Sequence, residues 1–273
     1  MSHVQIIALG FFLIIMTGTL LLMLPVSTKN GQGASFLDAL FTATSASCVT
    51  GLIVQDTSLY WSGFGQAVIL TMIQIGGLGF MTIATMFFML LRKKVHLRGR
   101  EILTESISVH QVGGILRLAK KILWGTFLIE GAGALLLMIR LVPRYGIQGV
   151  WMSVFHSVSA FCNGGFDLMG QHTGAYSSLT SFSNDWLVNL VIMALIIIGG
   201  VGFIVWDDIL THRWKIKRYH LHSKIVLWMS AVLVFGGAVA FFLVERNATG
   251  ANLSFGDQIL AALFDSVTAR TAG

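Results

Sequence analysis

The chain has 273 residues, of which 55% are hydrophobic and only 11% charged. An ordinary soluble domain carries about a quarter charged residues, and a globular core cannot hide this much apolar surface from water. The composition therefore predicts an integral membrane protein. Two cysteines are too few for a disulfide framework. The net charge of +6 does not indicate a nucleic-acid partner, because the basic residues follow a membrane pattern described below.

Five apolar stretches are long enough for a helix to cross a bilayer, which takes about 20 residues. They cover residues 4–24, 64–91, 120–142, 186–206 and 225–244. The first stretch is long and has neither a basic leader nor a small-residue cleavage site, so we interpret it as a transmembrane helix and not as a signal peptide.

Three shorter apolar stretches lie between these spans, at residues 36–46, 150–161 and 255–268. Each has roughly 11–14 residues, which is too short to cross a bilayer but suits a re-entrant pore helix. Glycine is abundant, with 30 residues, and in apolar segments it indicates close helix packing or cavities lined by backbone.

The basic residues predict the orientation. Of the 18 Lys and Arg residues, 13 lie in segments 92–121 and 213–224 and 5 lie elsewhere. Cytoplasmic loops carry an excess of Lys and Arg, so both segments and the N-terminus are predicted to be cytoplasmic. Segments 92–121 and 213–224 lie on the same side of the membrane only if the short apolar stretches do not cross it. They must then enter from the other side of the membrane and return to it. The repeating units are then parallel and not inverted.

An internal repeat supports this arrangement. The sequence LFTATSASCVTGL at residues 40–52 matches VFHSVSAFCNGGF at 154–166 with a constant offset of 114. A third copy, LFDSVTARTAG at 263–273, needs one deletion, and IGGLGF at 75–80 returns as IGGVGF at 198–203. Each unit is predicted to hold an outer helix, a pore helix, a glycine-bearing loop and an inner helix. The units cover residues 1–116, 117–222 and, incompletely, 223–273.

This geometry suits potassium. An entering ion exchanges its water for oxygen ligands, and backbone carbonyls supply them without a full counter-charge. Glycine accepts the backbone angles that turn carbonyls inward. A short helix that enters from outside points its partially negative C-terminus towards the membrane centre, which favours a cation.

The phrases CVTGL at 48–52, CNGGF at 162–166 and RTAG at 270–273 resemble the Trk/Ktr/HKT superfamily of potassium transporters, and most of all its Ktr transmembrane subunit of the KtrB type. The resemblance runs the whole length of the chain. It implies an all-α integral membrane fold in which four parallel repeats build one filter, here two complete repeats and a partial third. The implied ion-filter residues are Cys48, Val49, Thr50, Gly51, Cys162, Asn163, Gly164, Gly165, Thr271, Ala272 and Gly273.

The resemblance also implies partners and cargo. Such subunits form homodimers in the bacterial plasma membrane, contact its lipid, and sit on a cytosolic ring of nucleotide-binding regulatory subunits of the KtrA type. They move K⁺ with a dependence on Na⁺, and need no covalent cofactor. Sodium-passing members carry Ser at the first filter glycine, so Gly51 favours potassium. The sequence stops at Gly273, before a third inner helix, and we expect such an incomplete pore not to conduct alone.

Several residues have two interpretations. Glu130, inside a span, is either functional or hydrogen-bonded to a neighbouring pore helix. Arg270, at the edge of the third loop, either tunes ion occupancy or ties the loop down. Four hydroxyl residues of the pore helices are expected to bond the backbone, with direct ion contact as the alternative; they are Thr44, Ser45, Ser157 and Ser159. The glycines of the inner helices are expected to serve packing, with ion contact as the alternative; they are Gly76, Gly77, Gly79, Gly199, Gly200 and Gly202.

The cytoplasmic segments allow alternatives as well. His212, His220 and His222 are expected to lie in a solvated or partner-facing loop, with metal binding as the alternative. The segment 92–118 either lies on anionic lipid or docks the regulatory ring. An intramembrane enzyme would need a catalytic dyad or metal cluster, and the spans offer only Glu130. A transporter of another solute with inverted repeats conflicts with the charge pattern, whereas an assembly role stays open.

Overall fold

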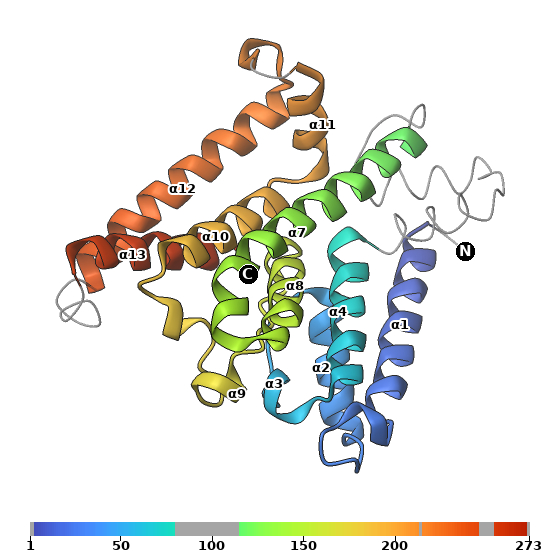
Figure 1. The fold of residues 1–273 in the computed structure, drawn as a ribbon. Helices are drawn as coiled ribbons and strands as arrows, with labels where there is room; N and C mark the ends of the chain where they lie inside the picture. The colour runs from blue at the N-terminus through green and yellow to red at the C-terminus, as the bar shows by residue number, and fades with distance from the viewer. Residues whose placement is uncertain (1–2, 80–114, 213–214, 246–253, 272–273) are drawn as a thin grey trace. The chain divides into compact units, whose positions relative to one another are not determined.

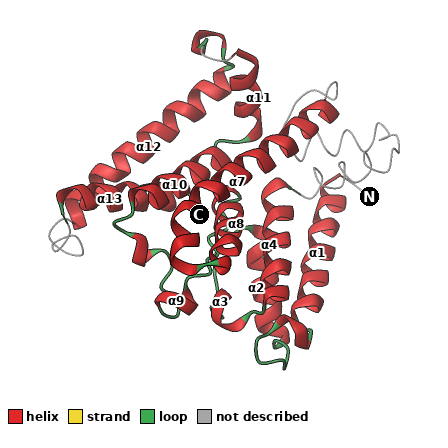
Figure 2. Cartoon of the chain, viewed as in Figure 1, coloured by secondary structure: helices red, strands yellow, loops and turns green. Residues whose placement is uncertain are grey.

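The apolar sequence folds into helices because a helix satisfies its own backbone hydrogen bonds in lipid. A computed structural model describes residues 3–79, 115–212, 215–245 and 254–271, and every regular element in these ranges is a helix (Figures 1 and 2). The chain forms two units, Met1–Ile129 and Glu130–Gly273, and the boundary falls inside helix α7. Each unit is described by itself.

The first unit carries the first repeat. α2 packs between α1 and α4, and these two helices also touch each other. The side chains of Ser35, Asp56 and Ser62 cap α2, α3 and α4, respectively, by accepting backbone N–H groups of the first turn. The elements are α1 (His3–Leu22), η1 (Pro25–Ser27), α2 (Phe36–Cys48), α3 (Thr57–Tyr60) and α4 (Gly63–Leu78).

The second unit carries the end of α7 (Ile115–Tyr145), the second repeat and the described part of the third. α10 packs against α8 and α13, and α12 packs along α13 and α11. The remaining elements are α8 (Ile147–Phe161), α9 (Gly170–Thr173), η2 (Thr180–Phe182), α10 (Trp186–Gly200), α11 (Phe203–His212), η3 (Ile216–Arg218), α12 (Leu221–Glu245) and α13 (Phe255–Ala269).

The helix lengths confirm most of the predicted spans. Three helices are long and apolar enough to cross a membrane, over Gln5–Leu22, Ala119–Tyr145 and Leu221–Glu245. The short helices α2, α8 and α13 have 13, 15 and 15 residues and coincide with the three predicted pore helices. The predicted span 64–91 is described only up to residue 79, where it forms α4, and its remainder lies outside the described residues.

One prediction about the spans is wrong. Residues 186–206 do not form one straight helix, because α10 ends at Gly200 and α11 leaves at an angle of 96°. The break falls where Gly202 has a φ of +87°, a conformation that favours glycine. The indole N–H of Trp206 donates to the carbonyl oxygen of Ile198 at 2.9 Å and holds the bend. The counterpart Gly79 ends α4 with a φ of +78°.

Candidate functional site

The first glycine-bearing loop follows α2 and is fixed at both ends by one serine. The backbone N–H of Thr50 donates to the carbonyl oxygen of Ser45 at 2.9 Å. The hydroxyl of Ser45 donates to the carbonyl oxygen of Leu52 at 2.7 Å. Between these two bonds the chain turns twice through left-handed backbone, with a φ of +57° at Val49 and +75° at Gly51.

The second loop follows α8 and repeats this geometry residue for residue. The N–H of Gly164 donates to the carbonyl oxygen of Ser159 at 2.6 Å. The Ser159 hydroxyl donates to the carbonyl oxygen of Phe166 at 2.7 Å. The φ angles are +58° at Asn163 and +68° at Gly165. Every one of these positions lies 114 residues after its counterpart, so the sequence repeat is also a repeat of backbone conformation.

Each loop contains three consecutive carbonyl oxygens that have no hydrogen-bond donor among the described residues. Among the residues that the structure describes, the carbonyls of 49–51 and of 163–165 accept no hydrogen bond. An unpaired carbonyl is costly in an apolar surrounding unless another partner completes it. A dehydrated monovalent cation is such a partner, since backbone carbonyl dipoles replace its water ligands. The loops thus provide the ligand type that a potassium filter requires.

The inner helices approach the ends of the pore helices through glycine. A Cβ atom on Gly76 of α4 would lie 2.9 Å from the carbonyl carbon of Ser47 in α2, and closer still to its oxygen. A Cβ atom on Gly199 of α10 would lie equally near the carbonyl carbon of Phe161 in α8. No real Cβ atom packs this closely against backbone, so the packing role expected of these two glycines is confirmed.

The third loop is described only at its start. Arg270 follows α13, and its guanidinium Nη1 donates to the hydroxyl of Ser230 in α12 at 2.8 Å. The same guanidinium covers Gly200, where a Cβ atom would lie 2.8 Å from Nη2. Arg270 therefore ties the loop to α12 and α10, as one of its two interpretations expects. Thr271 is the last described residue, and the predicted filter residues Ala272 and Gly273 lie outside the described part.

A cavity of about 260 Å³ in the second unit borders both the second loop and α13. Gly165 and Phe166 line it from the loop and Thr268 lines it from α13, so the second and third repeats share one hollow. Asp167 and Asp265 add carboxylates to its wall. Sequence reasoning did not single out these two acids: Asp167 comes directly after the second copy of the motif, and Asp265 lies in the third copy at a position where the other copies carry Thr42 and His156.

His156 is a second residue that the sequence reasoning missed. It is buried in α8, where its ring Nδ1 lies 2.7 Å from the carbonyl oxygen of Met152 and its Nε2 lies 3.3 Å from the backbone nitrogen of Leu168. A neutral imidazole satisfies both contacts by donating from Nδ1 and accepting at Nε2. The imidazole thereby links the irregular stretch after the second loop to α8. Its position, 114 residues after Thr42, gave no indication of this role.

Glu130 lies directly behind the second loop. Its side chain is buried, and its Oε1 is 3.8 Å from the thiol of Cys162, the first predicted filter residue of that loop. Its backbone carbonyl accepts the hydroxyl of Ser157 in α8 at 2.6 Å. The backbone of Glu130 is therefore bonded to the pore helix, and its carboxylate contacts the first residue of the loop. Neither Cys162 nor the exposed Cys48 forms a disulfide bond within the described part of the chain.

The histidines of the basic loop have a structural partner. Asp208 of α11 is buried, and its Oδ1 lies 2.8 Å from Nδ1 of His212. Its Oδ2 accepts the backbone N–H of His220 at 2.8 Å, which joins α11 to the start of α12. Within the described residues no three His, Cys, Asp or Glu side chains could hold a metal ion. Of the basic segment 92–118, residues 92–114 lie outside the described part of the chain.

Taken together, the membrane helices, the repeated short helices and the carbonyl-rich loops define a multi-pass membrane protein with the architecture of an ion transporter. Comparison with known proteins agrees. The family model TrkH, described as a cation transport protein, matches residues 2–273. The chain belongs to this family, which consists of transporters and not enzymes.

The relatives are potassium uptake proteins. The chain is 44% identical over 275 residues to the potassium/sodium uptake protein NtpJ of Enterococcus hirae, and 43% identical over 272 residues to the Ktr system potassium uptake protein B of Bacillus subtilis. It is 39% identical over 273 residues to the protein of that name from Vibrio alginolyticus. The matches cover 100%, 98% and 98% of this chain but 59%, 59% and 58% of the relatives. The chain thus spans about three fifths of their length.

Proposed function

We propose that this chain forms part of the pore of a potassium uptake protein, with K⁺ passing along backbone carbonyls of the glycine-bearing loops. The observation that carries the proposal is the pair of matching loops with uncommitted carbonyls at residues 49–51 and 163–165. Three repeats, at residues 1–116, 117–222 and 223–273, each contribute one loop. Gly51, Gly165 and Gly273 are the filter glycines, and Cys48 and Cys162 begin the first two loops.

Glu130 and Arg270 support the filter from behind. The buried carboxylate of Glu130 meets the thiol of Cys162, and the guanidinium of Arg270 binds Ser230. Both contacts lie next to filter residues and neither requires the side chain to touch the ion. Their role in the proposal is to position the second and third loops.

The distribution of basic residues supports the proposed orientation, and the similarity to potassium uptake proteins supports the proposed cargo and partners. The 13 basic residues in segments 92–121 and 213–224 put these segments and the N-terminus in the cytoplasm of a bacterial cell, with the loops entering from outside. The relatives' names, potassium/sodium uptake protein and Ktr system potassium uptake protein B, support K⁺ as cargo, with Na⁺ dependence. A homodimer on a cytosolic nucleotide-binding ring of the KtrA type completes the proposed assembly.

The test is potassium rescue. The protein is expressed in full-length form, meaning this chain extended by a third inner helix and a fourth repeat, in bacteria that lack potassium uptake, and growth is measured at low external potassium. We expect Gly51→Asp to abolish growth, because it adds a carboxylate in the filter at a φ of +75°. The matched control is Gly31→Asp, which makes the same change at a φ of +68° in open space.

Two results would contradict the proposal. The first is growth of Gly51→Asp at the rate of Gly31→Asp, which would remove Gly51 from the ion path. The second is failure of the wild-type protein to restore growth although it is inserted in the membrane with its regulatory partner, which would exclude potassium as the cargo.

A further inference from the structure

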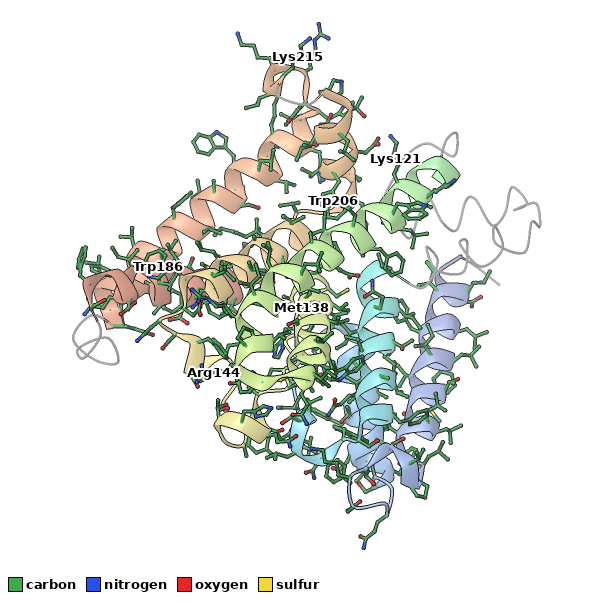
Figure 3. The ribbon with its side chains drawn as sticks, in the orientation of Figure 1. Lys121, Met138, Arg144, Trp186, Trp206 and Lys215 are labelled. Atoms are coloured by element: carbon green, nitrogen blue, oxygen red, sulfur yellow. The ribbon has the colours of Figure 1, made fainter. Side chains whose placement is uncertain are left out.

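Two arginines and a polar loop form a shallow pocket at the end of α7, away from the filter loops along the chain. The pocket has a volume of about 410 Å³. Arg140 and Arg144 come from successive turns at the C-terminus of α7, and the rest of the lining comes from residues 181–186. Figure 3 labels Arg144 and Trp186 in this region.

The pocket carries more positive than negative charge. Asp185 is the one carboxylate in its lining, and its Oδ2 lies 3.2 Å from Nε of Arg140. Its Oδ1 already accepts the backbone N–H groups of Leu187 and Val188 as the cap of α10. The pocket therefore contains two guanidinium groups and one carboxylate, and one oxygen of that carboxylate, Oδ1, is already bonded to the backbone of α10.

Arg144 is held in place by aromatic rings and has no acidic partner among the described residues. Its guanidinium carbon lies 4.9 Å from the ring centre of Phe182 and 5.6 Å from that of Tyr145. These cation–π contacts hold the guanidinium near the rings and leave its N–H groups able to donate to an anion. The lining also offers the Ser181 hydroxyl and the Asn184 amide as further donors, whereas the Ser183 hydroxyl donates to Asn184 Oδ1 at 3.2 Å.

The position of the pocket along α7 places it at the level of the lipid headgroups. The apolar stretch Ala119–Tyr145 of α7 is long enough to cross a bilayer, and it ends at this pocket. Trp186 and Tyr145 flank the arginines, and such aromatic residues are enriched at the headgroup level of membranes. Five of the 18 basic residues lie outside the two segments predicted to be cytoplasmic. Two of these five, Arg140 and Arg144, line this one pocket.

We propose that this pocket binds the phosphate group of an anionic phospholipid. The planar guanidinium presents a fork of N–H donors that matches two oxygens of a phosphate, and charge-assisted bonds of this kind are among the strongest in proteins. Phosphate groups are abundant at this depth of a bilayer. The helix macrodipole and Asp185 account for part of the arginine charge, but not for a second guanidinium that contacts two aromatic rings and pairs with no carboxylate among the described residues.

The experiment measures which lipids stay on the protein. Full-length protein is placed in nanodiscs with equal amounts of phosphatidylglycerol and phosphatidylcholine, and the lipids retained after delipidation are counted by native mass spectrometry. We expect phosphatidylglycerol to be enriched on wild type. The double variant Arg140→Gln/Arg144→Gln should lower this enrichment roughly tenfold, the effect of losing a charge-assisted hydrogen bond. Lys215→Gln/Lys217→Gln, which removes two charges from an exposed loop, should leave it unchanged.

Two further variants separate a built site from simple charge. Asp185→Asn removes the competing carboxylate, while asparagine still caps α10, so we expect phosphatidylglycerol to bind more tightly. Arg140→Lys/Arg144→Lys keeps the charge and loses the fork, and should lose most of the enrichment. Full retention by the lysine pair, or by the glutamine pair, would overturn the proposal.

A competition arm identifies the source of the phosphate. Inorganic phosphate is added at the concentration at which a short-chain phosphatidylglycerol displaces the retained lipid. Failure of inorganic phosphate to displace it supports the lipid as occupant. Equal displacement by inorganic phosphate would overturn the lipid assignment.

Discussion

Replacing Gly199 by alanine tests whether the inner helix holds the second loop in place. The added Cβ would lie 2.9 Å from the carbonyl carbon of Phe161 and nearer still to its oxygen, whereas ordinary contact begins at 3.4 Å. The helices α10 and α8 must therefore separate by at least 0.5 Å, and neither contacting group is a flexible side-chain end. Overpacking of this kind costs about 1–3 kcal/mol.

The displacement falls one residue before the loop, because Phe161 ends α8 and Cys162 follows it. We expect Gly199→Ala to lower the midpoint of thermal unfolding by roughly 2–10 °C and to reduce potassium uptake at least about tenfold, since ligand positions shifted by a fraction of an ångström no longer fit the ion. Unfolding of detergent-purified protein and rubidium or potassium flux into vesicles measure the two effects.

The control is Gly236→Ala in α12. It makes the same substitution in an apolar helix, but no atom lies within 4 Å of the new Cβ. The control should unfold at the wild-type temperature or above it, because alanine favours a helix by about 0.5–1 kcal/mol over glycine. Equal stability and equal flux of the two variants would show that the close approach of α10 to α8 has no part in holding the loop.

Three other substitutions probe the loops and the junction between α11 and α12. Ser159→Ala frees the carbonyl of Phe166 and should cost only about 0.5–1.5 kcal/mol of stability but lower the preference of uptake for potassium over sodium; Ser159→Thr should restore it, and unaltered selectivity in the alanine variant would contradict the pinning role. Val49→Asn should raise stability by about 1 kcal/mol, because a β-branched residue is strained at positive φ and asparagine is not; a lower unfolding temperature would refute this. Asp208→Ala removes the bond from the His220 N–H that joins α11 to the start of α12, together with the bond to His212 within α11, and should cost about 1.5–3 kcal/mol, seen as faster proteolysis between residues 212 and 221; cleavage at the wild-type rate would argue against it.

The sequence predicted the elements that depend on local pattern. The short helices could be located because apolar runs of limited length recur with a fixed offset, and α2, α8 and α13 lie where the repeat put them. The left-handed turns at Gly51 and Gly165 could be anticipated because a glycine that recurs at one place in two copies indicates a backbone position that needs positive φ.

The bend after α10 could not be predicted in this way. Residues 186–206 form one apolar run, and hydropathy alone does not separate a straight span from a broken one. The break depends on Gly202 and on the bond from Trp206 to Ile198, which is a contact between two turns of the chain. The pocket of Arg140 and Arg144 was hidden for a similar reason, since its carboxylate Asp185 lies 45 and 41 residues away in the sequence.

The two described loops show what the repeat retains. Two residue types that both copies share have a direct role in the loop. The hydroxyl of Ser45 or Ser159 donates to a carbonyl oxygen, and Gly51 or Gly165 permits a positive φ. Where the copies differ, as at Thr50 and Gly164, the equivalent bond uses only the backbone N–H. A site built from side-chain ligands would have to repeat those side chains. A site built from carbonyl oxygens has to repeat only the path of the main chain, and this is what the two loops have in common.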